Sequence, residues 1–350
     1  MTGPDHEFAY AGNISIRSWI MQRCHGWTVS DIKQLSPAEQ WRFYTILSFL
    51  TAGYIRLDKD HQASPATPGS NVLPVELAQP FIGIAAGLGM PPVMTYTAYV
   101  LINYMLKDPR GPLTRENLQS IFRFYELPDE EHFRQVHVCC EIAAAAAIRA
   151  AFTALEAARS GDRAVVLTSL KAMQVGITEI MVEMGKMRKG CDPKVFFQPI
   201  RIPLGGWPER MGGVIFKGVP GMPEPYISGG ASGTQTTTIP VLDAALGIGH
   251  VDGNAEFMAD QVAKMPPAHR LFLAKIISMA KDGGNLQTFA MSTKDSHIIN
   301  AYAACVDAMH GFRKAHQAFV STYILRQMPS AEQSQPAAPQ GTGDRALLGS

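Results

Sequence analysis

The chain has 350 residues, of which 46% are hydrophobic and 17% are charged. This length allows one large domain or two smaller ones, and the apolar content excludes general disorder. The 31 Lys and Arg residues against 30 Asp and Glu residues give a formal net charge of +1, so we expect no nucleic-acid partner and no anionic membrane surface. Composition therefore predicts a globular protein that handles a small molecule.

The cysteines and the N-terminus predict the compartment. Five cysteines without a CxxC pair suggest neither a disulfide framework nor a zinc site. The first ten residues, MTGPDHEFAY, lack the basic and apolar regions of a secretory signal. The most apolar long stretch, Ile142–Ala158, contains Arg149 and Glu156 and falls short of a membrane span. We therefore expect a cytoplasmic protein with no membrane partner.

Helices are predicted along most of the chain. Ser36 is followed by Pro37 and then, three residues after the serine, by Glu39, which is typical of a capped helix start. Apolar residues at helical spacing predict further helices over residues 74–88, 92–106, 114–125, 128–160, 164–189, 239–248, 254–265, 269–281 and 294–327. The predicted fold class is therefore all-α.

Glycine and proline interrupt this pattern and predict irregular segments. Within residues 192–226 the run GGVIFKGV predicts a small hairpin, and this region is expected to line a site. The glycine- and threonine-rich residues 229–238 form either a lid over a ligand or an ordinary linker. The composition of residues 329–350 predicts a disordered tail.

Two histidines on apolar helices are candidates for chemistry, because P-loop, dinucleotide-binding, nucleophile-elbow and HExxH motifs are absent. His316 shares a helix face with Arg313 and Phe319, and it is either a core histidine bonded to a carbonyl or an axial haem ligand. His137 lies one turn beyond Phe133, and it is either a core residue or a distal-pocket donor or proton shuttle. Spacing alone favours the core interpretation for both.

Arg201 is a third candidate, since it lies among apolar neighbours in VFFQPIRIPLGGW. It either pairs with a carboxylate of the protein or binds an anionic ligand group through two hydrogen bonds. The internal pair is the more frequent case, because unpaired arginine is rarely buried.

Several segments together resemble the indoleamine 2,3-dioxygenase family, haem enzymes that open the indole ring of tryptophan. They follow the family's order over most of the chain: LPVELAQPF, GMPPVMTY, EIAAAAAIRA, DPKVFFQPIRIPLGGW, GGASG, LDAALGI, MPPAHRLFL and FRKAHQAFVSTYI. The resemblance implies a haem-binding helical bundle. It also implies a small N-terminal α domain over residues 1–124, a large haem-binding helical domain over residues 125–328, and the tail 329–350.

The resemblance assigns roles by position. His316 falls where the family's proximal haem ligand falls, and Arg313 and Asp243 match a pair that supports this side of the haem. Arg201 matches the residue that grips the substrate's carboxylate. The remaining substrate contacts and walls of the distal pocket correspond to Tyr96, Tyr99, Val100, Phe133, Phe196, Phe197, Leu204, Gly230, Ala231 and Ser232.

The chain departs from the family at the distal pocket. Mammalian members carry a serine where His137 stands, whereas the sister enzyme tryptophan 2,3-dioxygenase also places a histidine over the haem. We therefore expect a bacterial-like member in which His137 is catalytic and hydrogen-bonds either to the bound oxygen or to the indole N–H. Arg134 replaces a phenylalanine and Tyr99 a cysteine, so Arg134 either grips a substrate carboxylate or extends to solvent.

The resemblance implies a dioxygenase of tryptophan catabolism, as in the kynurenine pathway. Haem b would carry the reaction, in which O₂ enters across the indole C2–C3 bond of L-tryptophan or a close derivative, and an electron donor would keep the iron ferrous. Because a donor at His137 can favour O–O cleavage, one alternative is a haem mono-oxygenase of secondary metabolism acting on another indole or aromatic amino acid. A haem-binding sensor or carrier without turnover is the other.

Overall fold

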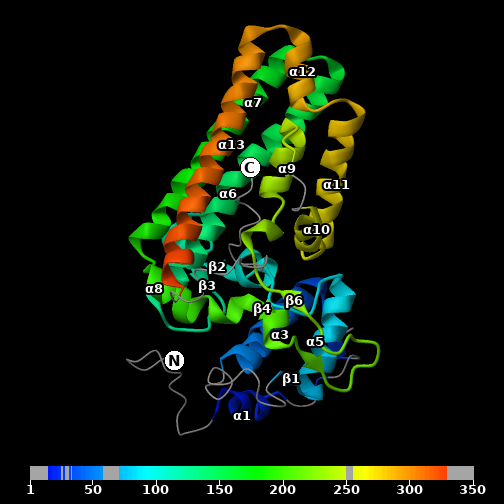
Figure 1. Ribbon diagram of the computed structural model, residues 1–350, viewed down its shortest axis with the longest axis vertical. Coiled ribbons are helices and arrows are strands. Elements are labelled where there is room, and N and C mark those ends of the chain that lie inside the picture. The colour runs from blue at the N-terminus through cyan, green and yellow to red at the C-terminus, as the bar shows by residue number, and fades with distance from the viewer. Residues whose placement is uncertain are drawn as a thin grey trace.

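Helices make up most of the described chain, so the predicted all-α class is confirmed (Figure 1). The computed structural model describes residues 15–24, 27, 31–32, 34–57, 71–249 and 255–328. The predicted disordered tail lies outside the described residues.

The secondary-structure elements are as follows. The α-helices are α1 (Ile16–Met21), α3 (Pro37–Arg56), α5 (Val75–Leu88), α6 (Pro128–Ser160), α7 (Arg163–Gly185), α8 (Pro193–Val195), α9 (Thr238–Leu246), α10 (Ala255–Ala263), α11 (Pro267–Asp282), α12 (Leu286–Thr293) and α13 (Ser296–Tyr323). The 3₁₀ and π turns are η1 (Thr97–Leu101), η2 (Arg115–Asn117), η3 (Lys186–Lys189), η4 (Phe196–Ile200), η5 (Ile202–Gly205), η6 (Glu209–Met211), η7 (Gly233–Gln235) and η8 (Leu325–Gln327). The strands are β1 (Val72–Leu73), β2 (Tyr104–Leu106), β3 (Leu118–Ser120), β4 (Gly206–Trp207), β5 (Ile215–Phe216) and β6 (Ser228–Gly229).

Helices with clear end signals form where they are predicted. At the start of α3 the Ser36 hydroxyl accepts from the Glu39 amide, and the Glu39 carboxylate accepts from the Ser36 amide at 2.8 Å. Helix α6 occupies the predicted residues 128–160, and Asp162 then caps α7 by accepting from the amide of Val165. Helix α12 was not predicted, although Asn285 caps it in the same way.

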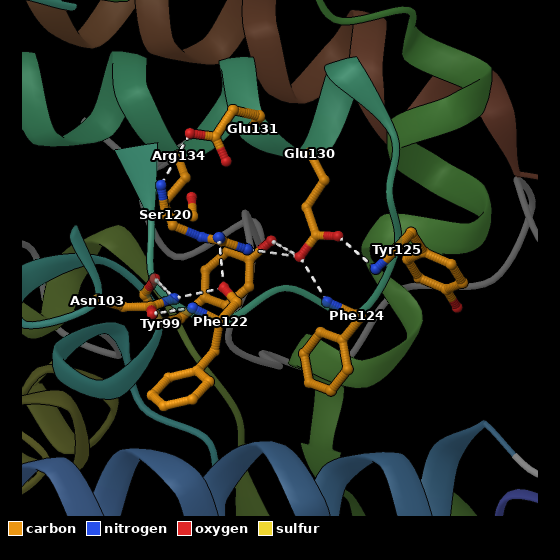
Figure 2. Close-up of polar contacts among 9 residues, drawn as sticks. All are labelled: Tyr99, Asn103, Ser120, Phe122, Phe124, Tyr125, Glu130, Glu131 and Arg134. Carbon is orange, nitrogen blue, oxygen red and sulfur yellow. Dashed lines mark hydrogen bonds and ion pairs between the residues drawn. The ribbon is translucent and has the colours of Figure 1, made fainter. Parts of the chain in front are cut away.

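Two predicted helices, residues 92–106 and 114–125, are wrong. Part of the first is the π turn η1, and its end, β2, pairs antiparallel with β3 from the second. Side chains from outside residues 114–125 form hydrogen bonds with backbone groups that a helix there would need for its own hydrogen bonds (Figure 2). Asn103 binds the amide and carbonyl of Phe122, and Glu130 accepts from the amides of Phe124 and Tyr125.

The predicted GGVIFKGV hairpin is also wrong. Its strand β5 pairs in parallel with the distant strand β1, so that Val72 is opposite Ile215. Its antiparallel pairing among the described residues is limited to a single bridge between Val214 and Tyr226. The segment therefore links the middle of the chain to its N-terminal part.

Three long helices form the frame of the larger part of the molecule. Helix α6 packs against α7 and α9, and α7 packs against α13 (Figure 1). Gly176 of α7 faces Ala147 of α6 so closely that a Cβ on the glycine would lie 2.9 Å from the Ala147 backbone nitrogen. The close spacing of α6 and α7 therefore requires glycine at this position.

The buried apolar residues form three clusters. One joins the N-terminal helices to residues as late as Ala231, including Trp207 and Phe216. A second fills the space among α6, α7, α9, α11, α12 and α13, and a third lies where η4 meets the end of α13. The predicted boundary after residue 124 stays a prediction. The first cluster crosses it, because Leu204 and Trp207 pack with residues before that boundary.

Two helices pass a length-and-composition test for membrane spans. They are residues Pro128–Ser160 and residues Arg163–Lys189, and 39% of the apolar window of each is buried inside the protein. Residues 142–158 alone are too short for a membrane span, as expected, but the whole of α6 is long and apolar enough for one. Core helices of globular proteins pass the same test, and Glu130 and Arg134 at the start of α6 are buried within the protein.

We predict that Arg134→Met lowers the free energy of unfolding by about 3–5 kcal/mol, because it removes the cation paired with the buried Glu130 carboxylate. Urea denaturation of the full chain measures this loss. Glu116→Gln, which breaks the exposed pair with Arg115, is the control and should leave the free energy nearly unchanged. An Arg134→Met protein as stable as this control would contradict the prediction.

Candidate functional site

One largely apolar cavity lies between α6, α7 and α13 and is closed by η1, η4 and the 231–239 segment. Its walls include the predicted residues Tyr96, Tyr99, Val100, Phe133, His137, Phe196, Leu204, Ala231, Ser232, Arg313 and His316. The remaining lining residues are Val136, Cys140, Glu141, Ile180, Met184, Met187, Gly233, Thr234, Thr236, Thr238, Ile239, Phe257, Phe312, Phe319, Val320, Tyr323 and Ile324. The cavity therefore brings together residues from distant parts of the chain.

Helix α6 presents Phe133, His137 and Glu141 to the cavity, because residues four apart lie on one helix face. The Nδ1 atom of His137 lies 2.7 Å from the carbonyl oxygen of Phe133, and the two rings are 4.1 Å apart between centroids. A carbonyl only accepts hydrogen bonds, so Nδ1 carries the proton and Nε2 of the neutral ring carries a lone pair. Burial lowers the pKa of His137, which keeps the ring neutral at pH 7.

Helix α13 presents His316 on the same cavity. Phe312 lies one turn before it, with ring centroids 6.3 Å apart, and Phe319 lies one turn after it. Burial, followed by the proximity of His137, lowers the pKa of His316 to about 4. The ring is therefore a neutral imidazole that retains some exposed surface because it faces the cavity.

The predicted pair of Arg313 and Asp243 forms behind this wall. An Nη atom of Arg313 lies 2.6 Å from an Oδ atom of Asp243, which is buried on α9. Arg313 also lines the cavity, three residues before His316. The pair therefore fixes the segment of α13 that carries His316 to a neighbouring helix.

Aromatic rings form the wall on the α6 side. Phe133 stacks on Phe196 with centroids 4.9 Å apart and an interplanar angle of 30°, and Tyr323 meets Phe196 edge-on at 5.8 Å. Phe196 begins η4 directly after α8, which Asp192 caps by accepting from the amides of Lys194 and Val195. These rings form an apolar wall of the size and chemistry that suits a flat aromatic ligand.

Glu141 is a partly buried acid on the cavity wall that the sequence pattern did not indicate. Its carboxylate accepts from the hydroxyls of Tyr96 at 3.0 Å, Thr236 at 2.8 Å and Thr238 at 3.1 Å. Burial raises the pKa of Glu141, and the three hydroxyl donors act in the opposite direction. Its position four residues after His137 on one helix face is the signal that could have found it.

The glycine–threonine segment is held over the cavity by hydrogen bonds. The buried Gln235 side chain accepts from the amide of Tyr96 at 2.8 Å and donates to the carbonyl of Gly230 at 2.7 Å and to Gln261 at 3.0 Å. A Cβ on Gly230 would lie 1.9 Å from the carbonyl oxygen of Leu204, so only glycine fits there. Gly230 thus shapes the segment without itself lining the cavity.

Besides Gly230, three further predicted substrate contacts do not line the cavity. Arg134 is 1% exposed and pairs with Glu130, and its guanidinium also lies 4.3 Å from the centroid of the Tyr99 ring. The expectation that it extends to solvent is wrong, and its charge is engaged inside the protein. Arg201 and Phe197 lie together outside the wall, with the guanidinium 5.6 Å from the ring centroid.

The wall suits a haem group better than a metal ion held by the protein alone. The described residues contain no group of three or more His, Cys, Asp or Glu side chains that could hold a metal. Haem iron needs only one axial ligand from the protein, and His316 is a neutral imidazole on a rigid helix with apolar neighbours. Arg313 adds a cation for an anionic group at the edge of such a ligand.

Comparison with known proteins gives one consistent family. The family profile described as "Indoleamine 2,3-dioxygenase" matches residues 11–346. Human indoleamine 2,3-dioxygenase 2 is 31% identical over 318 residues, which cover 89% of this chain and 75% of the human protein. Mouse indoleamine 2,3-dioxygenase 1 is 34% identical over 298 residues, covering 80% of this chain and 67% of the mouse protein.

A relative with a different name is also found. The myoglobin of Haliotis madaka is 26% identical over 286 residues, which cover 80% of this chain and 70% of that protein. The match of the family profile to nearly the whole chain settles the assignment. The chain belongs to the indoleamine 2,3-dioxygenase family.

Proposed function

We propose that this protein is a haem b-dependent dioxygenase that adds both atoms of O₂ across the indole C2–C3 bond of L-tryptophan or a close indole derivative. The product would be of the N-formylkynurenine type. Enzymes of this family are haem-dependent dioxygenases, and hence oxidoreductases. The observation that carries the proposal is the cavity itself, in which two neutral imidazoles from α6 and α13 share an apolar chamber with stacked aromatic rings.

In this proposal His316 holds the haem iron and the Arg313–Asp243 pair steadies the helix that carries it. When bound, the haem would supply the iron chemistry that activates dioxygen. The rings of Phe133 and Phe196 would orient the indole and exclude water from the chamber. The carboxylate-binding role of Arg201 stays a prediction, and its place outside the wall does not add support.

The hydrogen bond of His137 favours one of its two expected roles. Because Nδ1 donates to the Phe133 carbonyl, the neutral ring offers only a lone pair at Nε2 toward the cavity. Nε2 can therefore accept from the indole N–H, but it has no proton to donate toward dioxygen. Since the mono-oxygenase alternative depends on such a donor, this geometry does not favour it.

A second candidate function is a haem-based oxygen carrier, which the name of the Haliotis relative motivates. The chamber holds aromatic walls and a free imidazole lone pair, which suit an organic substrate better than O₂ alone. An external electron donor and a cytoplasmic location remain proposals from the sequence.

Turnover of L-tryptophan tests the proposed function directly. Reduced, haem-loaded protein is mixed with L-tryptophan and air, and the product mass is measured together with oxygen uptake. We expect a product that has gained two oxygen atoms and whose indole ring is open. A gain of one oxygen with the ring closed would support the mono-oxygenase, and oxygen binding without uptake would support the carrier.

The acceptor role of His137 predicts a dependence on the substrate N–H. His137→Ala should lower kcat/KM for L-tryptophan by about 10²-fold or more, because a positioned acceptor is lost. The loss for 1-methyltryptophan, which lacks the N–H, should be much smaller. Steady-state kinetics measure both, with His310→Ala, an exposed histidine on α13, as the control. Equal losses on the two substrates would exclude this role.

The Arg313–Asp243 pair predicts how firmly haem is retained. Asp243→Asn and Arg313→Leu should each weaken haem affinity by about 10–100-fold, because the helix that carries His316 loses its anchor. The rate of haem transfer to excess apomyoglobin measures retention. Lys186→Met, which breaks the ion pair with Glu183 at the end of α7, is the control. Unchanged transfer rates in both the Asp243→Asn and Arg313→Leu variants would count against the anchoring role.

A further inference from the structure

The second ring nitrogen of His137 is a strong metal ligand without a partner in the described protein. Its Nδ1 proton is committed to the Phe133 carbonyl at 2.7 Å, which leaves the lone pair of the neutral ring at Nε2. Among the residues that the structure describes, none donates a hydrogen bond to Nε2. A neutral imidazole nitrogen of this kind is a common ligand of iron.

The position of the ring directs this nitrogen toward the chamber. His137 and His316 come from different long helices, α6 and α13, and line the same cavity. The His137 ring lies between two aromatic rings, with centroids 4.1 Å from tilted Phe133 and 6.1 Å from Tyr96, which it meets edge-on.

The other polar side chains of the wall are already engaged. The two carboxylate oxygens of Glu141 accept from Tyr96, Thr236 and Thr238. The thiol of Cys140 donates to the carbonyl of Ile180 at 3.8 Å, and Arg313 pairs with Asp243. Within the described wall, His137 is therefore the residue best able to supply a further ligand to iron held by His316.

We propose that, in the haem-loaded protein without substrate, Nε2 of His137 coordinates the haem iron on the face opposite His316. This inference rests on the proposed function, since it takes His316 as the proximal ligand. The bond uses the existing lone pair of Nε2, so no proton is released when it forms. The resting protein is then six-coordinate and low-spin, with histidine on both faces of the haem.

The proposal gives one lone pair two successive uses. In the resting state the lone pair binds iron, and with substrate present it accepts the indole N–H. Substrate therefore breaks the iron–His137 bond when it enters and opens the distal face. Small ligands offered without substrate must compete with His137 and bind more weakly than they would to an open site.

The spin state of the ferric, haem-loaded full chain tests this proposal. Absorption and electron paramagnetic resonance spectra should show a low-spin species in the wild-type protein and in His310→Ala. His137→Ala should be high-spin, and free imidazole should restore the low-spin spectrum by filling the vacated place. His137→Gln, which keeps an amide donor for the Phe133 carbonyl, should also be high-spin and serves if the alanine variant does not load haem.

Ligand and substrate titrations provide a second readout. If the six-coordinate form makes up nine-tenths of the resting protein, cyanide should bind about tenfold more tightly to His137→Ala than to wild type. L-tryptophan added to the wild-type protein should convert part of the low-spin signal to high-spin.

The outcomes separate this inference from the proposed function. A high-spin wild-type protein, or a His137→Ala protein that stays low-spin without imidazole, would overturn the inference even if tryptophan is oxidised. A wild-type chain that loads no haem would instead refute the proposed function, and the inference with it.

Discussion

The buried carboxylate of Glu130 holds three parts of the molecule in place. It accepts from the amides of Phe124 and Tyr125, from the Tyr99 hydroxyl at 3.2 Å and from the Arg134 guanidinium (Figure 2). A carboxylate this deeply buried is stable only when its oxygens are fully engaged. The start of α6 is thereby fixed to a non-helical segment and to the turn that carries Tyr99. One helical turn further along lies the wall of the cavity.

The hydrogen bonds of Glu130 also help to determine the shape of the cavity. Phe133 and His137 extend from the anchored end of α6, while Glu141 binds the hydroxyls of the segment that closes the chamber. On the opposite side, Asp243 holds the part of α13 that carries His316. The helix that carries His137 is thus fixed by the hydrogen bonds that Glu130 accepts, and the helix that carries His316 by the ion pair of Arg313 and Asp243. Burial then keeps both rings neutral and available as ligands or acceptors.

The long helices could be predicted from the sequence because their signals are local. Caps such as Ser36 and apolar residues at helical spacing lie within the segment that they define. Residues 114–125 could not be predicted in this way, since Asn103 and Glu130, which hold their backbone groups, lie outside that segment. Glu130 is brought to them by the start of another helix.

The residues of the candidate site could likewise be predicted only in part. Most residues that the resemblance assigns, His316 and His137 among them, line one cavity, and their roles stay predictions. The resemblance did not indicate that Arg134 is buried. Its guanidinium pairs inside the protein with Glu130, which lies one helical turn before it. Glu141 was overlooked because its three hydroxyl partners come from two other parts of the chain. A pattern on one helix does not reveal such partners.

The contact between Gly176 and Ala147 also affects the rigidity of the chamber wall. The backbones of α6 and α7 lie so close at this contact that the two helices cannot slide along each other without collision. The part of the wall that they form is therefore rigid. The 229–238 segment is held differently: hydrogen bonds of Gln235 and Glu141, rather than close backbone packing, keep it in place. Water can replace such contacts one at a time, whereas it cannot replace interlocked backbone. Of the parts of the wall, the 229–238 segment is therefore the one held by contacts that water can replace.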